Sequence, residues 1–424
     1  MMNSQADHKA GSAYPVDANN SPTTARDSGV EMDKTFVRPE DLAIHGAPPA
    51  FTQPLHVGRP TMGDRENFLR LADEMFSNQW YTNNGPLVQR LEQEVATYLG
   101  VRNCVAMSNG TTALEIAIRA LGMTDEVIVP SYTFIATAHA LHWQGITPVF
   151  ADIDPETCNL DPVAVRRMIT SRTRGIIGVH LWGRPAPVGA LQEIANEHGI
   201  PLLLDAAHAF GCTLDGTMIG SAGRAEVLSF HATKFFNSFE GGAIVTNNDD
   251  LAETARLMRN FGFAGNDNVI YPGTNAKMTE ICAAMGLTNL RGLPATVAAN
   301  RANYHAYQDF LTTVPGISLL EYDERESNNF QYIVALVDED RTNVRDQLVE
   351  GLEAENVLAR RYFWPGCHRM KPYRDLFPNA GILLPVTESV AERTIVLPTG
   401  PSITVDMIRT ITSAMRCILE SSMD

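Results

Sequence analysis

Short apolar runs alternate with helix-like segments between residues 104 and 245, and this alternation constrains the fold more than any other feature. The candidate strands are residues 104–107, 127–129, 148–150, 175–179, 202–204 and 227–230. The candidate helices between them are residues 111–121, 134–143, 161–168 and 188–198. Nearly continuous apolar strands are typical of a sheet buried on both faces. The pattern therefore predicts an α/β fold with a mostly parallel sheet covered by helices on both sides.

The two ends of the chain follow other patterns. Residues 1–45 are rich in Ser, Asn, Asp, Thr and Ala, which predicts a flexible N-terminal tail, with partial order where residues 35–39 (TFVRP) begin to carry apolar groups. Residues 242–245 are expected to form a hairpin-like edge pair with the preceding strand. Further helices are predicted at 64–78, 279–290 and 296–312, and beyond about residue 300 strands at 319–322 and 331–337 combine with helices at 343–354 and 405–419. We therefore predict a tail over 1–45, a large domain over 46–298 and a smaller α+β C-terminal domain over 299–424.

Charge and cysteine content exclude some functions. The formal net charge is −16, with 49 acidic against 33 basic residues, which argues against nucleic acid or an anionic membrane as a partner. No apolar stretch approaches membrane-spanning length, and the N-terminus lacks a signal-peptide core. The six cysteines have no CxxC spacing, and His139 and His142 lack a third ligand nearby. We predict buried reduced thiols, no metal and a cytoplasmic location.

Polar groups follow two of the predicted strands where each strand ends. Asp205 and His208 come after residues 202–204, and Ser229 and Lys234 lie at the end of the run 227–230. The carboxyl ends of parallel strands meet at one edge of a sheet, so these side chains are expected to face one another. An amine and a carboxylate placed this way suit pyridoxal 5′-phosphate (PLP): the amine forms a Schiff base and the carboxylate pairs with the pyridinium nitrogen. The alternative is a surface lysine and a helix-capping aspartate.

Two further segments fit such a cofactor. Residues 108–114 join a strand to a helix, and the N–H groups of a helix N-terminus attract phosphate. Gly110 would allow close approach of the anion, and Thr111 and Ser229 would add hydroxyl donors. Phe134 follows another strand end and could stack on a flat ring, although an ordinary core aromatic explains it equally well.

These motifs, taken together, resemble a known family. Residues 108–114 (SNGTTAL), 130–134 (PSYTF), 205–209 (DAAHA), 229–234 (SFHATK) and 240–243 (EGGA) occur in the order and spacing of the DegT/DnrJ/EryC1/StrS family. That family contains PLP-dependent nucleotide-sugar aminotransferases of fold type I, and the resemblance covers the chain from about Trp80 to Pro398. It implies a fold type I PLP-dependent transferase with a large α/β/α domain and a smaller α+β domain.

The resemblance also implies roles for single residues. Lys234 would bond to PLP, and Asp205 would pair with the ring nitrogen. His208 would lie near the phenolic oxygen, and Phe134 would lie against the ring. Gly110, Thr111 and Ser229 would hold the phosphate. Asn275, in the segment Gly273-Thr274-Asn275, would reach the phosphate in the neighbouring subunit of a homodimer with shared active sites.

The resemblance implies transamination, because a dehydrating branch of the family carries His where this chain has Lys234. The amino donor would be glutamate and the acceptor a nucleotide-linked keto-sugar. Members that act at C3 often carry a Ser-Arg-Leu-Asp-like run where this chain has residues 276–279 (AKMT). We therefore expect conversion of dTDP-4-keto-6-deoxyglucose to dTDP-4-amino-4,6-dideoxyglucose. The alternatives are a 3-keto-sugar aminotransferase and a non-catalytic regulator. Phe239 departs from the family, which commonly has Gly there, and is expected to reshape the substrate pocket.

Overall fold

The computed structural model describes residues 34–339 and 344–421 of the 424-residue chain. The helices are α1 (Arg65–Asn78), α2 (Pro86–Leu99), α3 (Gly110–Ala120), α4 (Ala136–His142), α5 (Pro162–Met168), α6 (Val188–His198), α7 (Asp249–Arg259), α8 (Glu280–Leu311), α9 (Val344–Ala354), α10 (Lys371–Leu376), α11 (Pro385–Arg393) and α12 (Val405–Ser421). The strands are β1 (Leu55–His56), β2 (Asn103–Met107), β3 (Glu126–Pro130), β4 (Thr147–Ala151), β5 (Thr173–Val179), β6 (Leu202–Asp205), β7 (Thr213–Leu214), β8 (Thr217–Met218), β9 (Ala225–Ser229), β10 (Gly242–Thr246), β11 (Ile317–Leu319), β12 (Ile333–Val337), β13 (Val357–Leu358) and β14 (Thr394–Leu397).

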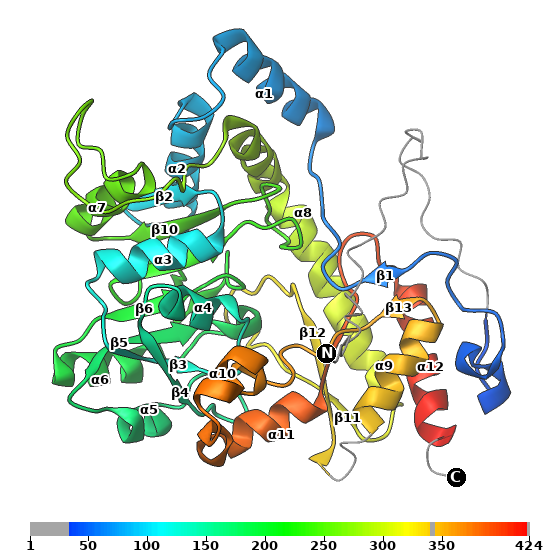
Figure 1. Ribbon diagram of the computed structural model, residues 1–424. Coiled ribbons are helices and arrows are strands. Elements are labelled where there is room, and N and C mark those ends of the chain that lie inside the picture. The colour runs from blue at the N-terminus through cyan, green and yellow to red at the C-terminus, as the bar shows by residue number, and fades with distance from the viewer. Residues whose placement is uncertain (1–33, 340–343, 422–424) are drawn as a thin grey trace, which may run out of the picture.

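The larger part of the molecule is built on a seven-stranded sheet in the order β2-β10-β9-β6-β5-β3-β4 (Figure 1). The pairs β3–β4, β3–β5, β5–β6 and β6–β9 are parallel, and only β10 runs antiparallel to its neighbours. The predicted α/β fold with a mostly parallel sheet is therefore confirmed. Residues 242–245 pair antiparallel with the preceding strand β9, as expected, but β10 lies between β9 and β2, so the expected edge position was wrong and β2 is the edge strand on that side.

The apolar runs form strands because each strand buries side chains on both faces. In β6, Leu203 belongs to the cluster that includes residues of α3, α4 and α7, whereas Leu202 and Leu204 belong to the cluster formed with α5 and α6. Successive strand residues point to opposite faces, so both sides of β6 must be apolar. The run ends where Asp205 reaches the sheet edge.

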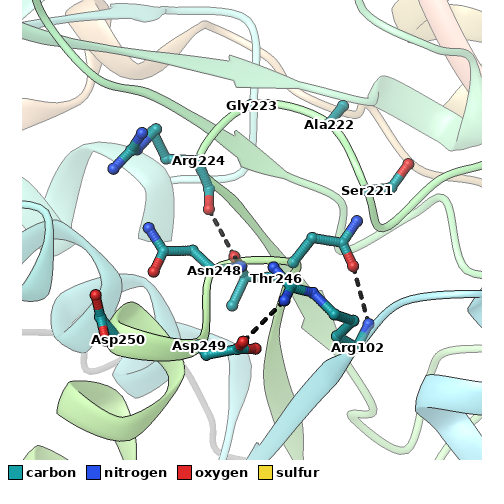
Figure 2. A pocket seen from close by; sticks show the side chains of 10 residues that line it. Arg102, Ser221, Ala222, Gly223, Arg224, Thr246, Asn248, Asp249 and Asp250 are labelled. Carbon is teal, nitrogen blue, oxygen red and sulfur yellow. Dashed lines mark hydrogen bonds and ion pairs between the residues drawn. The ribbon is translucent and has the colours of Figure 1, made fainter.

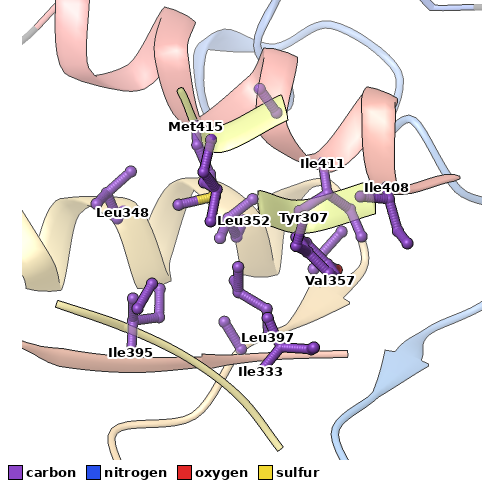
Figure 3. Close-up of a cluster of buried hydrophobic side chains, with 14 of the residues drawn as sticks. Tyr307, Ile333, Leu348, Leu352, Val357, Ile395, Leu397, Ile408, Ile411 and Met415 are labelled. Atoms are coloured by element: carbon purple, nitrogen blue, oxygen red, sulfur yellow. The ribbon is translucent and has the colours of Figure 1, made fainter. Parts of the chain in front are cut away.

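The smaller part of the molecule has its own apolar core (Figure 3). The antiparallel sheet β11-β12-β14 contributes Ile333, Ile395 and Leu397, while α9 and α12 contribute buried residues such as Leu352 and Ile411. This arrangement confirms the predicted smaller α+β unit. The predicted boundary between residues 298 and 299 stays a prediction, because α8 runs through it and contributes to the cores of both parts.

Helix α8 is longer than the sequence indicates. We expected separate helices at 279–290 and 296–312, whereas the structure has one helix of 32 residues with Pro294 inside. Proline removes one hydrogen bond and costs about 3 kcal/mol in a helix interior. Burial on both sides of Pro294 offsets that cost, since Leu287 packs in the large core and Tyr307 in the small one.

The N-terminal segment packs on the smaller part. Residues 1–33 of the predicted tail lie outside the described residues, but residues 34–45 are built into the fold. Phe36 and Leu42 are buried with the C-terminal core, and β1 pairs in parallel with β13. Glu355 is fully buried and accepts hydrogen bonds from the amine of Lys34 at 2.7 Å and the N–H group of Ala50 at 2.7 Å. The tail thus contains an ordered segment, as the apolar groups of residues 35–39 indicated, and the order extends through Leu42. No helix among the described residues combines the length and hydropathy needed to cross a bilayer.

Candidate active site

A cavity of about 650 Å³ opens at the carboxyl ends of β6 and β9. It is lined mainly by residues of the large domain, together with three aromatic residues of the smaller part. Among the lining residues are Gly110, Thr111, Phe134, Asp205, His208, Ser229, Lys234, Glu240, Tyr332, Tyr362 and Phe363. The structure therefore brings together every predicted site residue except Asn275.

Asp205 ends β6 and is only 5% exposed. Its Oδ2 accepts a 2.9 Å hydrogen bond from the hydroxyl of Thr137, and its Oδ1 accepts a 3.1 Å bond from the N–H group of Ala207. Burial raises the pKa of this carboxyl group because the charged form is poorly solvated, while the bond from Thr137 acts in the opposite direction. A cationic partner in the cavity would favour the ionised form.

Lys234 is half-buried in the loop that follows β9. Its Nζ donates a 3.2 Å hydrogen bond to the hydroxyl of Tyr332. Burial lowers the pKa of Lys234 from 10.5 to about 8, although the charge of Asp205 opposes this shift. A large fraction of the amine is thus neutral near pH 8, which is the form that acts as a nucleophile or a base.

His208 is a buried, neutral imidazole. Its Nδ1 accepts a 3.2 Å hydrogen bond from the N–H group of Trp182, so the ring proton lies on Nε2. Burial lowers the pKa of His208 well below its usual range, and the nearby charge of Lys234 adds to the effect. The ring of Phe363 lies nearly parallel to it, with 5.9 Å between centroids and an angle of 9°. This packing holds His208 in one orientation.

The first turn of α3 forms the third side of the cavity. Asn109 caps the helix, and its Oδ1 accepts bonds from the N–H group and the hydroxyl of Thr112 at 2.8 and 2.7 Å. The N–H groups at the start of a helix have no acceptor within the helix and carry partial positive charge. A Cβ atom on Gly110 would lie 3.2 Å from the Cβ of Ser229, so glycine lets the helix end approach the end of β9 closely. An anion could bind between these two elements.

Three other residues that the sequence singled out lie in different surroundings. Phe134 lines the cavity and is 57% exposed, so it is not a core aromatic. Asn275 is exposed and forms a bridge with Asn260 outside the cavity lining. Phe239 has a φ of +63°, in the left-handed region where glycine is favoured, and its ring packs edge-on against Phe68 at 5.6 Å. This backbone conformation gives a physical reason for glycine at the corresponding position of the resembling family.

Sequence reasoning missed four residues of this site. Thr137 donates a hydrogen bond to Asp205. Its only signal in the sequence is its spacing of four residues from Thr133, and the two hydroxyl oxygens lie 3.2 Å apart. Tyr332, Tyr362 and Phe363 reach the cavity from the smaller part of the chain. Their sequence context resembles ordinary core aromatics, so only the tertiary structure reveals them.

A second hollow, of about 450 Å³, lies at the opposite ends of the strands from the cavity that contains Lys234 (Figure 2). Arg224 precedes β9 and Arg102 precedes β2, so this hollow lies at the amino ends of those strands. Arg102 is paired with Asp249 at 2.8 Å, and both side chains are largely exposed. It contains none of the predicted site residues, and we do not assign it to the reaction.

His139 and the cysteines lie outside the cavity and contribute to packing. His139 forms a 2.7 Å hydrogen bond with the hydroxyl of Tyr373. All six cysteines are free thiols; five are buried, and Cys282 is half-buried. Within residues 34–339 and 344–421, no group of three or more His, Cys, Asp or Glu side chains is arranged to hold a metal ion.

The seven-stranded sheet with a smaller α+β unit beside it, and the site at the carboxyl ends of its strands, define the class of fold type I PLP-dependent transferases. More narrowly, the chain belongs to the DegT/DnrJ/EryC1/StrS aminotransferase family, whose sequence profile matches residues 63–416. The resemblance found in the sequence motifs is confirmed, and it extends beyond residues 80–398 on both sides.

Individual relatives are similar over nearly their whole length. The structure is similar to that of DesI, determined in the presence of its TDP-sugar product, with 49% sequence identity, a TM-score of 0.86, and coverage of 90% of this chain and 97% of DesI. A dTDP-4-amino-4,6-dideoxy-D-glucose transaminase of Shigella dysenteriae is 36% identical, covering 86% of this chain and 99% of the relative. A GDP-perosamine synthase of Caulobacter vibrioides is 34% identical, covering 82% and 94% respectively.

Proposed function

We propose that this protein uses PLP to transfer the amino group of glutamate to the C4 carbon of a nucleotide-linked 4-keto-6-deoxy sugar. The observation that carries the proposal is the placement of Lys234 and Asp205 at one cavity, with the α3 N-terminus at its third side. The preferred substrate is dTDP-4-keto-6-deoxyglucose and the product dTDP-4-amino-4,6-dideoxyglucose. The names of the Shigella relative and of the DesI complex support this choice of sugar nucleotide.

The residues of the cavity fit PLP in number and chemistry. Lys234 supplies an amine of lowered pKa for the covalent bond, and Asp205 supplies a buried carboxylate for the ring nitrogen. The first turn of α3, with Gly110 and Thr111, and the hydroxyl of Ser229 supply donors for the phosphate. When bound, PLP acts as an electron sink that stabilises negative charge on the carbon that loses its proton.

The protein's own groups would then divide the work. Lys234 would be placed to move the proton of the reacting carbon as a general base and acid, for which a pKa of about 8 is suitable near neutral pH. Asp205 holds a negative charge against the ring nitrogen, and Thr137 keeps that carboxylate in place. His208 donates from Nε2, which fits a position beside an anionic phenolic oxygen. Phe134 covers one face of the ring.

The first prediction concerns regiochemistry. With glutamate as donor, dTDP-4-keto-6-deoxyglucose is expected to yield a 4-amino-4,6-dideoxy sugar, and the 3-keto isomer is expected to be a poor substrate. The site chooses between them by which carbon it holds at bonding distance, and small misplacements cost about a hundredfold in rate. The segment after Gly273 and the side chain of Phe239 are expected to set how far the sugar enters the site and so which carbon reacts. Lys277 is a candidate for binding the diphosphate of the substrate.

Product NMR with each keto-sugar supplied separately checks this prediction. Amination only at C3 would replace the substrate with the 3-keto isomer and leave the cofactor assignment intact. The GDP-linked sugar is the matched comparison for the nucleotide, because one relative is named for a GDP-linked product. A regulator without catalytic activity is disfavoured, because both Lys234 and Asp205 are present.

We also propose that the protein acts in the cytoplasm.

The second prediction concerns assembly as a homodimer. Asn275 lies outside the cavity of its own chain, and we propose that it serves the phosphate in the partner's site. Asn275→Ala is therefore expected to impair turnover severely, and mixing it with inactive Lys234→Ala is expected to restore one site per heterodimer. Activity is measured after subunit exchange.

The control for this experiment is a mixture of Lys234→Ala with Asp205→Asn. Both of these residues line the same cavity of one chain, so every site in that heterodimer keeps a defect and no activity should return. An Asn275→Ala enzyme with full activity, or the absence of recovery in the first mixture, would contradict a shared site.

A further inference from the structure

The loop that carries Lys234 is held from outside by the N-terminal arm, which we define as residues 34–63. Thr61 donates a 3.2 Å hydrogen bond from its hydroxyl to the carbonyl of Phe235. Gly58 has a φ of +75°, and a Cβ atom there would lie 3.0 Å from the carbonyl oxygen of Thr233. The arm thus contacts the residues on both sides of Lys234.

Two buried asparagines, Asn237 and Asn289, connect the arm to this loop. The Nδ2 of Asn237 donates to the carbonyl of Thr61 at 2.9 Å and to the carbonyl of Lys234 itself at 3.4 Å. The Nδ2 of Asn289, on α8, donates to the carbonyl of Asn237 at 2.8 Å, and its Oδ1 accepts from the N–H group of Gly63 at 2.8 Å. Both side chains are at most 5% exposed. Buried amides are retained where their hydrogen bonds specify one arrangement.

The loop has some support of its own: the N–H group of Lys234 donates to the carbonyl of His231 at 2.8 Å, and the side chains of Phe235 and Phe236 are buried in the core. Its base is closed by the bond from the N–H group of Ser238 to the carbonyl of Phe230 at 2.9 Å. Directly after that base, Phe239 adopts a left-handed conformation, which is strained for a residue with a Cβ atom. Such a conformation persists only where the surroundings over-determine it. The contact of Phe239 with Phe68, in the helix that follows the arm, contributes to this restraint.

The other end of the arm is fixed to the smaller part of the molecule. Glu355 binds Lys34 and the N–H group of Ala50, and β1 pairs with β13. That part also supplies Tyr332, whose hydroxyl accepts the hydrogen bond from Lys234. The arm therefore links the loop that carries Lys234 to the smaller part of the molecule, whose Tyr332 contacts the lysine amine.

We propose that Asn237, Asn289 and the hydroxyl of Thr61 are positioning residues that keep the amine of Lys234 within bonding distance of the cofactor. None of the three lines the cavity or bonds to the amine of Lys234, and their contacts with the loop are to its backbone, including the carbonyl of Lys234. This inference rests on the proposed function, because it assumes that Lys234 bonds to PLP.

The experiment compares two forms of the cofactor on the apoprotein of the full chain. Pyridoxal 5′-phosphate condenses with the amine of Lys234 and releases water, whereas pyridoxamine 5′-phosphate has no aldehyde and makes no bond to lysine. Both share the ring and the phosphate. The ratio of their dissociation constants, measured by equilibrium dialysis, therefore reports the position of Lys234 separately from the rest of the site.

Asn237→Ala is expected to reduce the preference for the aldehyde form about tenfold to a hundredfold, with binding of the amine form unchanged. Thr61→Val removes one hydroxyl at nearly constant volume, so it folds readily and should shift the ratio in the same direction. The matched control is Asn303→Ala, an equally buried asparagine on α8 whose Nδ2 bonds the carbonyl of Gly400 far from the loop. It should leave the ratio at the wild-type value even if it lowers the melting temperature.

Two results would overturn the inference. One is a proportional weakening of both forms in Asn237→Ala and Thr61→Val, which would show a purely structural role, and the other is an unchanged ratio in both variants. Failure of the proposed function looks different: the wild-type protein would then prefer the aldehyde form no more strongly than Lys234→Ala does. The inference would fall with it.

Discussion

Lys234→Ala is expected to abolish turnover while leaving the fold intact. The variant loses both the amine that bonds to the cofactor and the general base and acid at the reacting carbon. General acid–base catalysis alone contributes about 10²–10⁴-fold, and the loss of the covalent anchor adds to this. Among the residues that the structure describes, the amine makes one hydrogen bond, of 3.2 Å to Tyr332, so its removal should change the melting temperature little.

The measurements are steady-state turnover and the visible absorption band of the cofactor. The wild-type protein should be yellow and lose that band on addition of glutamate, whereas the variant should show neither property. Lys371→Ala, at an exposed position on α10, is the matched control and should behave as the wild type. A Lys234→Ala enzyme with full activity would refute the assignment.

The same lysine predicts a pH dependence. Because burial lowers the pKa of Lys234 to about 8, the neutral amine becomes the major form only above that pH. Capture of PLP by the apoprotein should therefore accelerate as the pH rises from about 7 to 9 and then level off. A lysine with its ordinary pKa of 10.5 would still accelerate above pH 9.

Asp205→Asn is expected to reduce turnover by at least a hundredfold to a thousandfold. This substitution keeps the shape of the side chain but removes the charge that would hold a proton on the ring nitrogen. Removing one preorganised electrostatic group from a dry site typically costs about 10²–10³-fold in rate. Binding of the cofactor should survive better than turnover, because the covalent bond and the phosphate contacts remain.

This substitution also separates two interpretations of Asp205. Asparagine caps a helix or turn as well as aspartate does. Its Oδ1 can still accept the bond from the N–H group of Ala207, and its Nδ2 can donate to the hydroxyl oxygen of Thr137 in place of the present bond. If Asp205 were only a cap, the variant would keep wild-type turnover. Thr137→Val is the graded comparison: it removes one bond to the carboxylate and leaves the charge, so its loss should be smaller.

The positions of Lys234 and Asp205 could be predicted because their signals are local. An apolar run that ends in a polar residue indicates the end of a buried strand, and parallel strands bring such ends to one sheet edge. The same reasoning placed His208 and Ser229 beside them, and the affinity of a helix N-terminus for phosphate added the first turn of α3; the structure places all of these residues at one cavity. No contact between distant segments had to be known for this part of the site.

What only the tertiary structure decided depends on contacts between distant segments. Tyr332 meets Lys234 across 98 positions of sequence, and Thr61 meets Asn237 across 176. Helix α8 passes through Pro294 because two separate cores bury its two halves, and the segment from residue 34 is ordered because Glu355 and β13 hold it. The alternation of strands and helices specifies the sheet through local periodicity, whereas these long-range partners are chosen by packing and by the need of buried polar groups for hydrogen bonds. The sequence by itself thus indicated which groups meet at the candidate site, and the tertiary structure decided how its lysine is held.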